Sequence, residues 1–230
     1  MPSVMPGAGD LHLFLVAAGL RTGTFTDADK ALDLRGAVGA AKSDFESAMK
    51  YEPFLAAAAD VTVPFSPTDV LYLPNEMPML DLDGGFTSVT SVKVGVTPDN
   101  PTGDTLTVNE DYFLRPARAA SKGKPYTWIE FYNGLSTITL AGATNYPDSI
   151  RVAGKRGYSL TVPDWAFQAV TSRAAKRVMG RVATMIAGGA TSMQLGDDAW
   201  KYDPKVYEFV MKTADDDWKE AMRHRRIPIK

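Results

Sequence analysis

The chain has 230 residues, of which 45% are hydrophobic, so it can bury a sizeable core in one domain or in one domain with an appendage. A formal net charge of -2 at pH 7 excludes a globally basic nucleic-acid binder, and any contact with DNA has to be local. The sequence contains no cysteine, which excludes disulfides, thiolate metal sites and a cysteine nucleophile.

Two helices are predicted near the N-terminus. The first is the apolar run Leu11–Leu20, with Asp10 as a candidate N-cap; it is too short to span a bilayer and no basic residue precedes it, so we expect a buried helix. The second runs from Thr26 to about Lys50 and contains Gly36 and Gly39, each of which costs about 1 kcal/mol relative to alanine. Such glycines favour a close crossing by another backbone. The apolar face of this helix comprises Leu34, Val38, Ala41, Phe45 and Met49.

A β-rich block is predicted between residues 57 and 153, where short runs of Val, Thr, Tyr and Phe alternate with turn residues. Asn133-Gly134 is the strongest hairpin signal, and Asp83-Gly84-Gly85 predicts a tight turn between strands. The candidate strands are Asp60–Phe65, Val70–Leu73, Phe86–Val96, Thr105–Val108, Tyr112–Arg115, Tyr126–Tyr132, Ser136–Leu140 and Ser149–Ala153.

The stretch from Asp148 to Met179 joins the β-rich block to a long helix. Gly154 and Gly157 favour a turn with φ > 0, and Pro163 suits the first position of a helix that extends to about residue 186. The apolar face of this helix comprises Phe167, Val170, Ala174, Val178 and Val182. A basic side comprises Arg173, Lys176, Arg177 and Arg181, which indicates either a solvated face or a contact with an acidic partner or a neighbouring subunit.

The remaining residues, 187–230, predict a linker, a helix and a tail. Ala187–Ser192 is small and polar, and Asp203-Pro204 begins a helix to about Met222 that places Val206, Phe209, Val210 and Ala214 on one side. The chain ends with four cations around Ile227-Pro228-Ile229, an arrangement that suits an extended segment docking on a protein.

No catalytic, metal or cofactor site is predicted. The two histidines, His12 and His224, lie at opposite ends of the chain, and no zinc-protease, hydrolase or phosphate-loop motif is present. Asp81–Gly85 has the first carboxylates of a calcium loop but not its later ligands, which favours a turn. We therefore expect a protein that is not an enzyme.

Several short motifs, in this order, resemble the head-tail adaptor (connector, head-completion) proteins of tailed bacteriophages. The likeness covers about Thr26 to Val182. The residues that carry it are Leu71-Tyr72-Leu73-Pro74 with Pro78, Val89–Val94, Asp111-Tyr112, Ile150-Arg151-Val152, Gly157-Tyr158, Val162-Pro163 and Ala166–Ala169.

The resemblance implies a structural protein of the virion neck that assembles in the host cytoplasm. Such a protein forms a homo-oligomeric ring, expected to be twelvefold, under the portal protein, extends the DNA channel without reading its sequence, and connects the capsid to the tail or the next neck protein. No membrane contact is implied. The implied portal-binding residues are Arg223, Arg225, Arg226, Ile227, Pro228, Ile229 and Lys230, and the implied subunit-interface residues are Arg173, Lys176, Arg177 and Arg181.

The predicted fold class is α+β, with the N-terminal helices and the Pro163 helix in a bundle, a β-rich insertion between them, and an extended C-terminal tail. The predicted domains are an adaptor core, 1–186, and a C-terminal segment, 187–230, with the linker, helix and portal-anchoring tail. Two alternatives remain. One is a tail terminator or stopper, and the other is a carbohydrate-binding or enzymatic module that uses Tyr126, Trp128 and Tyr132 on one strand face.

Overall fold

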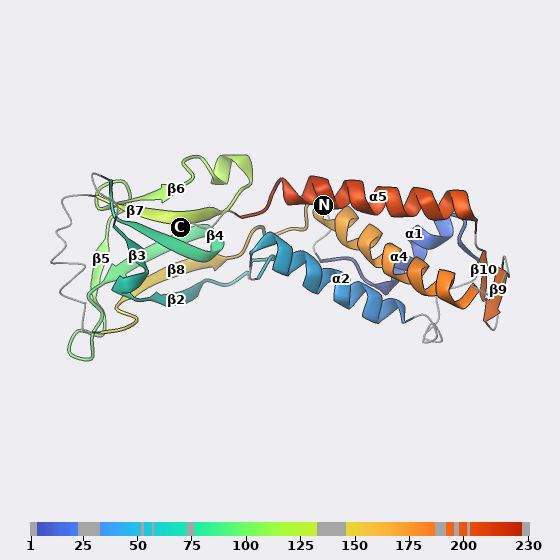
Figure 1. Ribbon diagram of the computed structural model, residues 1–230. Helices are drawn as coiled ribbons and strands as arrows, with labels where there is room; N and C mark the ends of the chain where they lie inside the picture. The colour runs from blue at the N-terminus through green and yellow to red at the C-terminus, as the bar shows by residue number, and fades with distance from the viewer. Residues whose placement is uncertain are drawn as a thin grey trace. The chain divides into compact units, whose positions relative to one another are not determined.

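The computed structural model divides the chain into two compact units. One unit comprises Met1–Met49 and Thr161–Arg225, and the other comprises Lys50–Leu160 and Arg226–Lys230. The structure describes residues 4–22, 33–51, 53–56, 58–72, 76–132, 146–186, 192–195, 198–201 and 203–226. The first unit is mainly helical and the second is mainly a sheet, so the predicted mixed class is confirmed (Figure 1).

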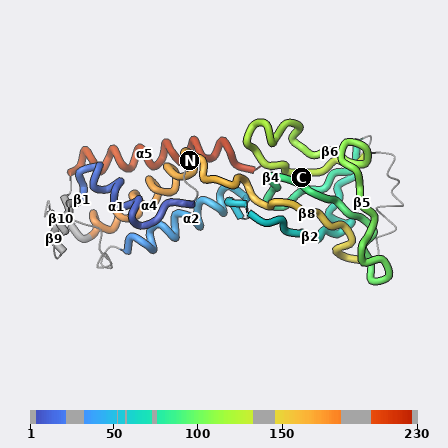
Figure 2. Tube along the Cα trace, turned by 180° about the vertical axis from the view of Figure 1, so that it is seen from behind, coloured from blue at the N-terminus to red at the C-terminus, as the bar shows by residue number. Residues whose placement is uncertain are grey.

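Four α-helices build the described part of the helical unit: α1 (Ala8–Ala17), α2 (Leu34–Met49), α4 (Asp164–Ile186) and α5 (Pro204–Met222). Helix α4 is central, because it contacts each of the other three. The view from behind shows the same neighbours around it (Figure 2). Within the described ranges, no helix is long and apolar enough to cross a membrane.

Helix α2 buries the face that its sequence periodicity predicts. All five residues of that face are buried, with Phe45 fully inaccessible to solvent. The explanation for its glycines is different from the predicted one. No atom lies within 4 Å of a Cβ built on Gly39, and a Cβ on Gly36 meets the carboxylate of Asp33, whose Oδ1 accepts a hydrogen bond from the Gly36 amide at 2.9 Å. The expected close crossing by another backbone is therefore wrong.

Both ends of the chain contribute capped helices. Helix α1 begins three residues before the predicted run, and Asp10 lies inside its first turn, where Oδ2 accepts a hydrogen bond from the Gly7 amide at 2.7 Å. Asp10 is therefore not the N-cap, although its carboxylate does satisfy a free amide at the helix start. Helix α5 begins as predicted, with the Asp203 carboxylate accepting from the Lys205 amide at 2.9 Å. Phe209 was expected on its apolar side but is 62% exposed.

A small antiparallel sheet in the helical unit was not predicted. Its central strand is β10 (Asp198–Lys201), which pairs with β1 (Arg21–Thr22) on one side and β9 (Ser192–Leu195) on the other. Residues 192–201 contain few β-branched residues and follow a small polar stretch, so the local sequence gave little indication of strands.

The described residues of the second unit contain a seven-stranded antiparallel sheet. Five strands follow the order β2-β8-β4-β7-β6, and β3 and β5 also pair with β4. The strands are β2 (Val61–Phe65), β3 (Val70–Leu71), β4 (Met79–Val94), β5 (Asp104–Leu106), β6 (Tyr112–Arg115), β7 (Tyr126–Phe131) and β8 (Ile150–Arg156).

The core of the sheet unit comes from the strands themselves. Its buried residues lie on β2, β3, β4, β6, β7 and β8, and include Leu80, Phe86, Ile129 and Val152. Strand β4 is the longest strand; its first part pairs with β3 and β7, and its last part pairs with β8 and β5. Irregular pairing bends a strand, and here it lets one strand serve both parts of the core.

Two glycines near the end of β8 have different roles. Gly157 has φ 133°, and a Cβ there would lie 2.6 Å from the Ala56 amide nitrogen, so the prediction of positive φ holds for this residue. Gly154 does not have positive φ but lies inside β8. A Cβ at Gly154 would lie 2.1 Å from the Ser88 carbonyl oxygen, so glycine is required here by the close approach of β4.

Several predicted features lie outside the described residues. These are the hairpin signal Asn133-Gly134, the strand Ser136–Leu140, the start of the second helix at Thr26, most of the linker from Ala187, and the tail residues Ile227, Pro228, Ile229 and Lys230.

Candidate functional site

The most unusual local structure in the sheet unit is a wide irregularity in β4 beside β7. Asp81 pairs with Trp128 and Phe86 pairs with Tyr126. The four residues Leu82 to Gly85 on β4 therefore lie opposite the single residue Thr127 on β7. The predicted tight turn between two strands is instead a bulge within one strand.

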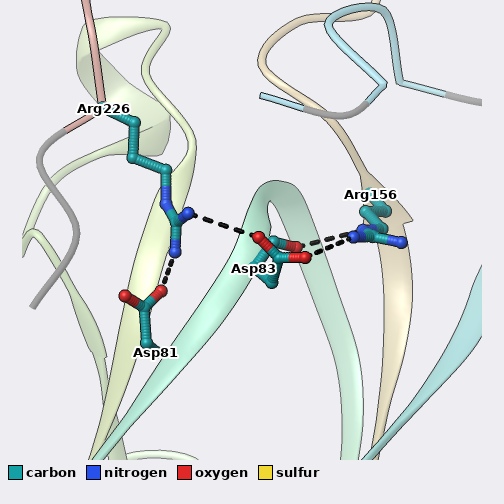
Figure 3. Close-up of polar contacts among 4 residues, drawn as sticks. All are labelled: Asp81, Asp83, Arg156 and Arg226. Atoms are coloured by element: carbon teal, nitrogen blue, oxygen red, sulfur yellow. Dashed lines mark hydrogen bonds and ion pairs between the residues drawn. The ribbon is translucent and has the colours of Figure 1, made fainter. Parts of the chain in front are cut away.

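The two glycines of this bulge set its shape. Gly84 has φ 80° and Gly85 has φ 71°, values that side-chain-bearing residues rarely adopt. Gly85 also has little room for a side chain, because a Cβ would lie 3.2 Å from the Tyr51 ring and 3.3 Å from the Tyr126 carbonyl oxygen. The bulge turns the backbone so that Asp81 and Asp83 both face one guanidinium (Figure 3).

That guanidinium belongs to Arg226. Its Nη2 forms an ion pair with Asp81 Oδ1, and its Nη1 lies 3.4 Å from Asp83 Oδ1. The Arg226 side chain is 6% exposed, whereas that of Asp81 is 29% exposed and that of Asp83 is 76% exposed. Asp81 and Asp83 together, which we term the acidic socket, therefore bind a cation that is almost fully removed from solvent.

A second arginine holds the outer carboxylate of the acidic socket. Arg156, at the end of β8, donates from Nε to the Asp83 carbonyl oxygen at 3.0 Å and from Nη2 to Asp83 Oδ2 at 3.1 Å. Asp83 thus lies between two guanidinium groups, as Figure 3 shows. Contacts to both its backbone and its carboxylate fix the geometry of the bulge.

Burial shifts the pKa values of Arg226 and Tyr51. Desolvation of the guanidinium lowers the pKa of Arg226, and the nearby Tyr51 opposes that shift. Burial raises the pKa of Tyr51 to about 12, Tyr158 adds to the increase, and Arg226 opposes it. The Tyr51 ring packs edge-on against Tyr158 at 5.0 Å between centroids, so the phenols beside Arg226 belong to an aromatic cluster.

The described residues of the predicted portal-binding set have different surroundings. Arg223 pairs with Glu220 at 2.5 Å on the surface, and Arg225 is exposed. Arg226 is buried in the acidic socket. His224, which lies between them, stacks on Trp165 at 4.2 Å between ring centroids. Their role in binding a portal stays a prediction.

The four predicted subunit-interface cations on α4 all have acidic partners within the helical unit. Asp44 on α2 pairs with Arg177 at 2.6 Å and with Arg173 at 3.6 Å. Lys176 pairs with Asp215 on α5 at 2.6 Å, and Arg181 pairs with Asp33 at 3.7 Å. These pairs are partly exposed and fasten α2 and α5 to α4, each with a small contribution to stability. A contact with a neighbouring subunit stays a prediction.

The aromatic face proposed for a carbohydrate ligand is engaged by its own neighbours. Trp128 Nε1 lies 3.5 Å from Glu130 Oε1, and the other oxygen of Glu130 accepts from Arg115 Nε at 2.7 Å. Tyr126 packs against the core of the sheet, and Tyr132 is 53% exposed. Glu130, the acidic residue on this face, therefore already forms an ion pair with Arg115.

One exposed loop of the sheet unit carries a local basic patch. Between Asp111 and Glu130 the sequence has no carboxylate, and three exposed cations, Arg118, Lys122 and Lys124, form no ion pair among the described residues. A short 3₁₀ helix, Ala120–Lys122, and backbone hydrogen bonds to the Ala119 carbonyl give the loop a defined shape. We term residues 115–124 the basic loop.

Within the described ranges, no group of three or more His, Asp or Glu side chains could hold a metal ion. The acidic socket has two carboxylates and holds a guanidinium. The sequence contained half of the signal, since Asp81-Leu82-Asp83-Gly84-Gly85 places two acids beside two glycines. The arginine that these carboxylates bind, Arg226, lies 143 residues after Asp83, and no local pattern in the sequence links the two.

Comparisons with known proteins add a similarity to a solved structure. The chain matches no protein-family model and no curated protein. Among solved structures, it is similar to a chain in one described as "Neck of empty GTA particle computed with C6 symmetry", with 17% sequence identity, coverage of 99% of this chain and 94% of that chain, and a TM-score of 0.42. An identity and a TM-score this low do not establish a shared fold.

Proposed function

We propose that the chain is a structural head-tail adaptor of a tailed phage. In this role it forms a homo-oligomeric ring under the portal protein, extends the DNA channel and connects the capsid to the tail or the next neck protein. Its action is assembly, without a catalytic step or a cofactor. It joins the virion neck during assembly in the host cytoplasm.

The observation that carries this proposal is the way the chain divides between its two units. Residues 1–49 and 161–225 form one helical unit, although the whole β unit lies between them in the sequence. This order of N-terminal helices, β insertion and Pro163 helix is the order that the sequence motifs of head-tail adaptors imply. The motif residues Ile150-Arg151-Val152 and Val162-Pro163 lie on β8 and directly before α4, where the chain passes from the sheet to the helices.

The sheet unit offers edges that ring formation would cover. Among the described strands, β2 and β6 are the ends of the strand order, and an unpaired edge presents free backbone donors and acceptors. Pro64 lies within β2, as is common for edge strands. Pairing or packing between neighbouring subunits around a closed ring would protect such edges.

Deleting Ile227–Lys230 tests the portal contact. We expect the truncated protein to fold and to form its ring, but not to join portal-bearing heads, because a short contact repeated around a ring gains strength through multivalency. Negative-stain imaging of the purified protein with and without its portal measures this directly. Phe209→Ala, which changes an exposed side chain on α5, is the control and should bind like the unmodified protein.

Normal joining of truncated protein to heads would contradict the assignment of the tail to the portal. A protein that binds a purified tail or downstream neck protein, but never the portal, would favour the tail terminator or stopper alternative.

The basic loop is the element that we assign to the DNA side of the ring. Its three cations lie within seven residues of the sequence and are exposed, whereas the cations of α4 are paired with carboxylates. Phosphate contacts of this kind are independent of base sequence and depend strongly on salt.

A double charge reversal, Lys122→Glu with Lys124→Glu, tests this assignment. We expect weaker binding to duplex DNA of any sequence and a log-log salt slope reduced by about 2 in magnitude, since each phosphate contact contributes about 0.9. The matched control is Lys205→Glu with Lys212→Glu, which reverses two exposed lysines on α5. The affinity for duplex DNA is measured by fluorescence anisotropy over a salt series. An equal loss of affinity in both double variants would show only a general charge effect and would contradict the assignment of the basic loop.

A further inference from the structure

We propose that the acidic socket, Asp81 and Asp83, is a reversible binding site for the guanidinium of Arg226. Arg226 immediately precedes Ile227–Lys230, the residues assigned to the partner contact. While Arg226 is bound to Asp81 and Asp83, its guanidinium is paired within the sheet unit. Once Arg226 leaves, its guanidinium becomes available to a partner surface that carries carboxylates.

The surroundings of Arg226 make its binding incomplete. Its side chain is 6% exposed, yet Nε has no hydrogen-bond partner among the described residues, so one donor of a buried guanidinium is unsatisfied. Its contact with Asp83 is long, at 3.4 Å, and that carboxylate is mostly exposed to solvent. Burying a charge is costly unless it is fully paired, and this charge is only partly compensated.

The acidic socket can be emptied without leaving a buried charge behind. Asp83 would keep both hydrogen bonds from Arg156, and its carboxylate is already 76% exposed. Asp81 is 29% exposed, so water can reach it after Arg226 departs. Gly84 and Gly85 shape the bulge through their positive φ angles, and Arg156 fastens it through Asp83. Both the ligand and the site therefore favour exchange over permanent burial.

This inference rests on the proposed function only for the identity of the partner. The exchange itself is a property of the free chain: an arginine moves between two carboxylates of the sheet unit and solvent. It can therefore be tested without a portal, and its failure would not affect the test by deletion of Ile227–Lys230.

Trypsin cleavage of the Arg226-Ile227 bond reports the exchange, because the protease must take the arginine side chain into its own pocket. The experiment uses the full chain with Arg225→Gln, which removes the neighbouring cleavage site, and mass spectrometry to follow the product ending at Arg226. Cleavage after the exposed Lys122 is the internal reference. We expect the Arg226 bond to be cut more slowly than the reference at low salt and faster as salt rises, since Asp83 is open to screening.

Replacing both socket carboxylates, Asp81→Asn with Asp83→Asn, should accelerate cleavage after Arg226 by about tenfold, the factor for losing one charge-assisted hydrogen bond, and should remove its salt dependence. The matched control, Asp99→Asn with Asp104→Asn, removes the same charge from exposed positions of the sheet unit and should change neither rate. Arg226→Lys keeps a trypsin site but cannot bridge two carboxylates, and it should also be cut faster.

Three results would overturn the inference. The first is cleavage after Arg226 in the parent chain as fast as after Lys122, and the second is no effect of salt. The third is an unchanged rate in the socket double variant. If that variant also exposes the Lys122 reference site through unfolding, Arg226→Lys decides, and a rate no faster than that of the parent contradicts the acidic socket.

Discussion

Replacing Phe45 by alanine is expected to destabilise the helical unit by about 3 to 5 kcal/mol. The ring is fully buried on α2 and lies 6.0 Å from Trp165 of α4 and 6.3 Å from Trp218 of α5, measured between centroids. Its removal therefore leaves a cavity where three helices meet and breaks two aromatic contacts. Differential scanning calorimetry, which resolves separate transitions if the two units unfold independently, should show a large fall in the melting temperature of the helical unit.

The same substitution at Phe209 is the control for this prediction. Phe209 is 62% exposed on α5, so its truncation should change stability by no more than about 0.5 kcal/mol. Comparable losses from the two variants would mean that Phe45 does not occupy the centre of the helical unit.

Gly154→Ala is expected to destabilise the sheet unit by about 3 kcal/mol or more, at the upper end of the cost of overpacking. Its Cβ would lie 2.1 Å from the Ser88 carbonyl oxygen and 2.9 Å from the Val89 Cα. Both are backbone atoms of β4, so they cannot move aside without disturbing the pairing of β4 with β8. A lower unfolding temperature and faster amide exchange in these two strands would be the measurable result.

Gly180→Ala is the matched control, because the same substitution is expected to raise stability here. This glycine lies within α4, and no atom lies within 4 Å of its Cβ position. Alanine there should stabilise the helix by about 0.5 to 1 kcal/mol. If both alanine variants shift stability in the same direction, then the steric account of Gly154 is wrong.

Helices α2, α4 and α5 were largely predictable because each one is amphipathic. Pro163 and Pro204 mark the starts of α4 and α5, and the buried face of α2 follows the expected spacing of three and four. The strand β6 was also placed correctly, from Tyr112 to Arg115, because turn residues bound it closely. Local periodicity is sufficient to predict a helix or a strand wherever one of its faces is buried and the other is exposed.

Strand β4 shows why local patterns fail. Two acids and two glycines at Asp81–Gly85 indicate a turn, yet the strand continues through them from Met79 to Val94. The neighbouring strands β7 and β8 pair with β4 on either side of Leu82–Gly85, so these residues form a bulge within one strand, and both neighbours lie far along the chain. Tertiary pairing therefore overrides a local signal that would be correct in isolation.

The candidate site was even less accessible to prediction. Asp81 and Asp83 were interpreted as turn residues, and Arg226 was grouped with the exposed cations of the tail. Their association depends on a bulge whose shape comes from Gly84 and Gly85 and on burial that no local composition reveals. The basic side of α4 was also difficult to interpret from the sequence. Arg177 was expected to face solvent or another subunit, whereas the structure pairs it with Asp44 on α2.

The division of the chain between two units also has a consequence for the order of folding on the ribosome. Residues 50–160 of the sheet unit are contiguous, so their strands can pair as soon as that stretch has emerged. The helical unit needs residues 1–49 together with 161–225, and must wait for nearly the entire chain to be synthesised. Arg226 can reach Asp81 and Asp83 only after that. The contact of Arg226 with the acidic socket is therefore expected to form last, on a sheet that is already complete.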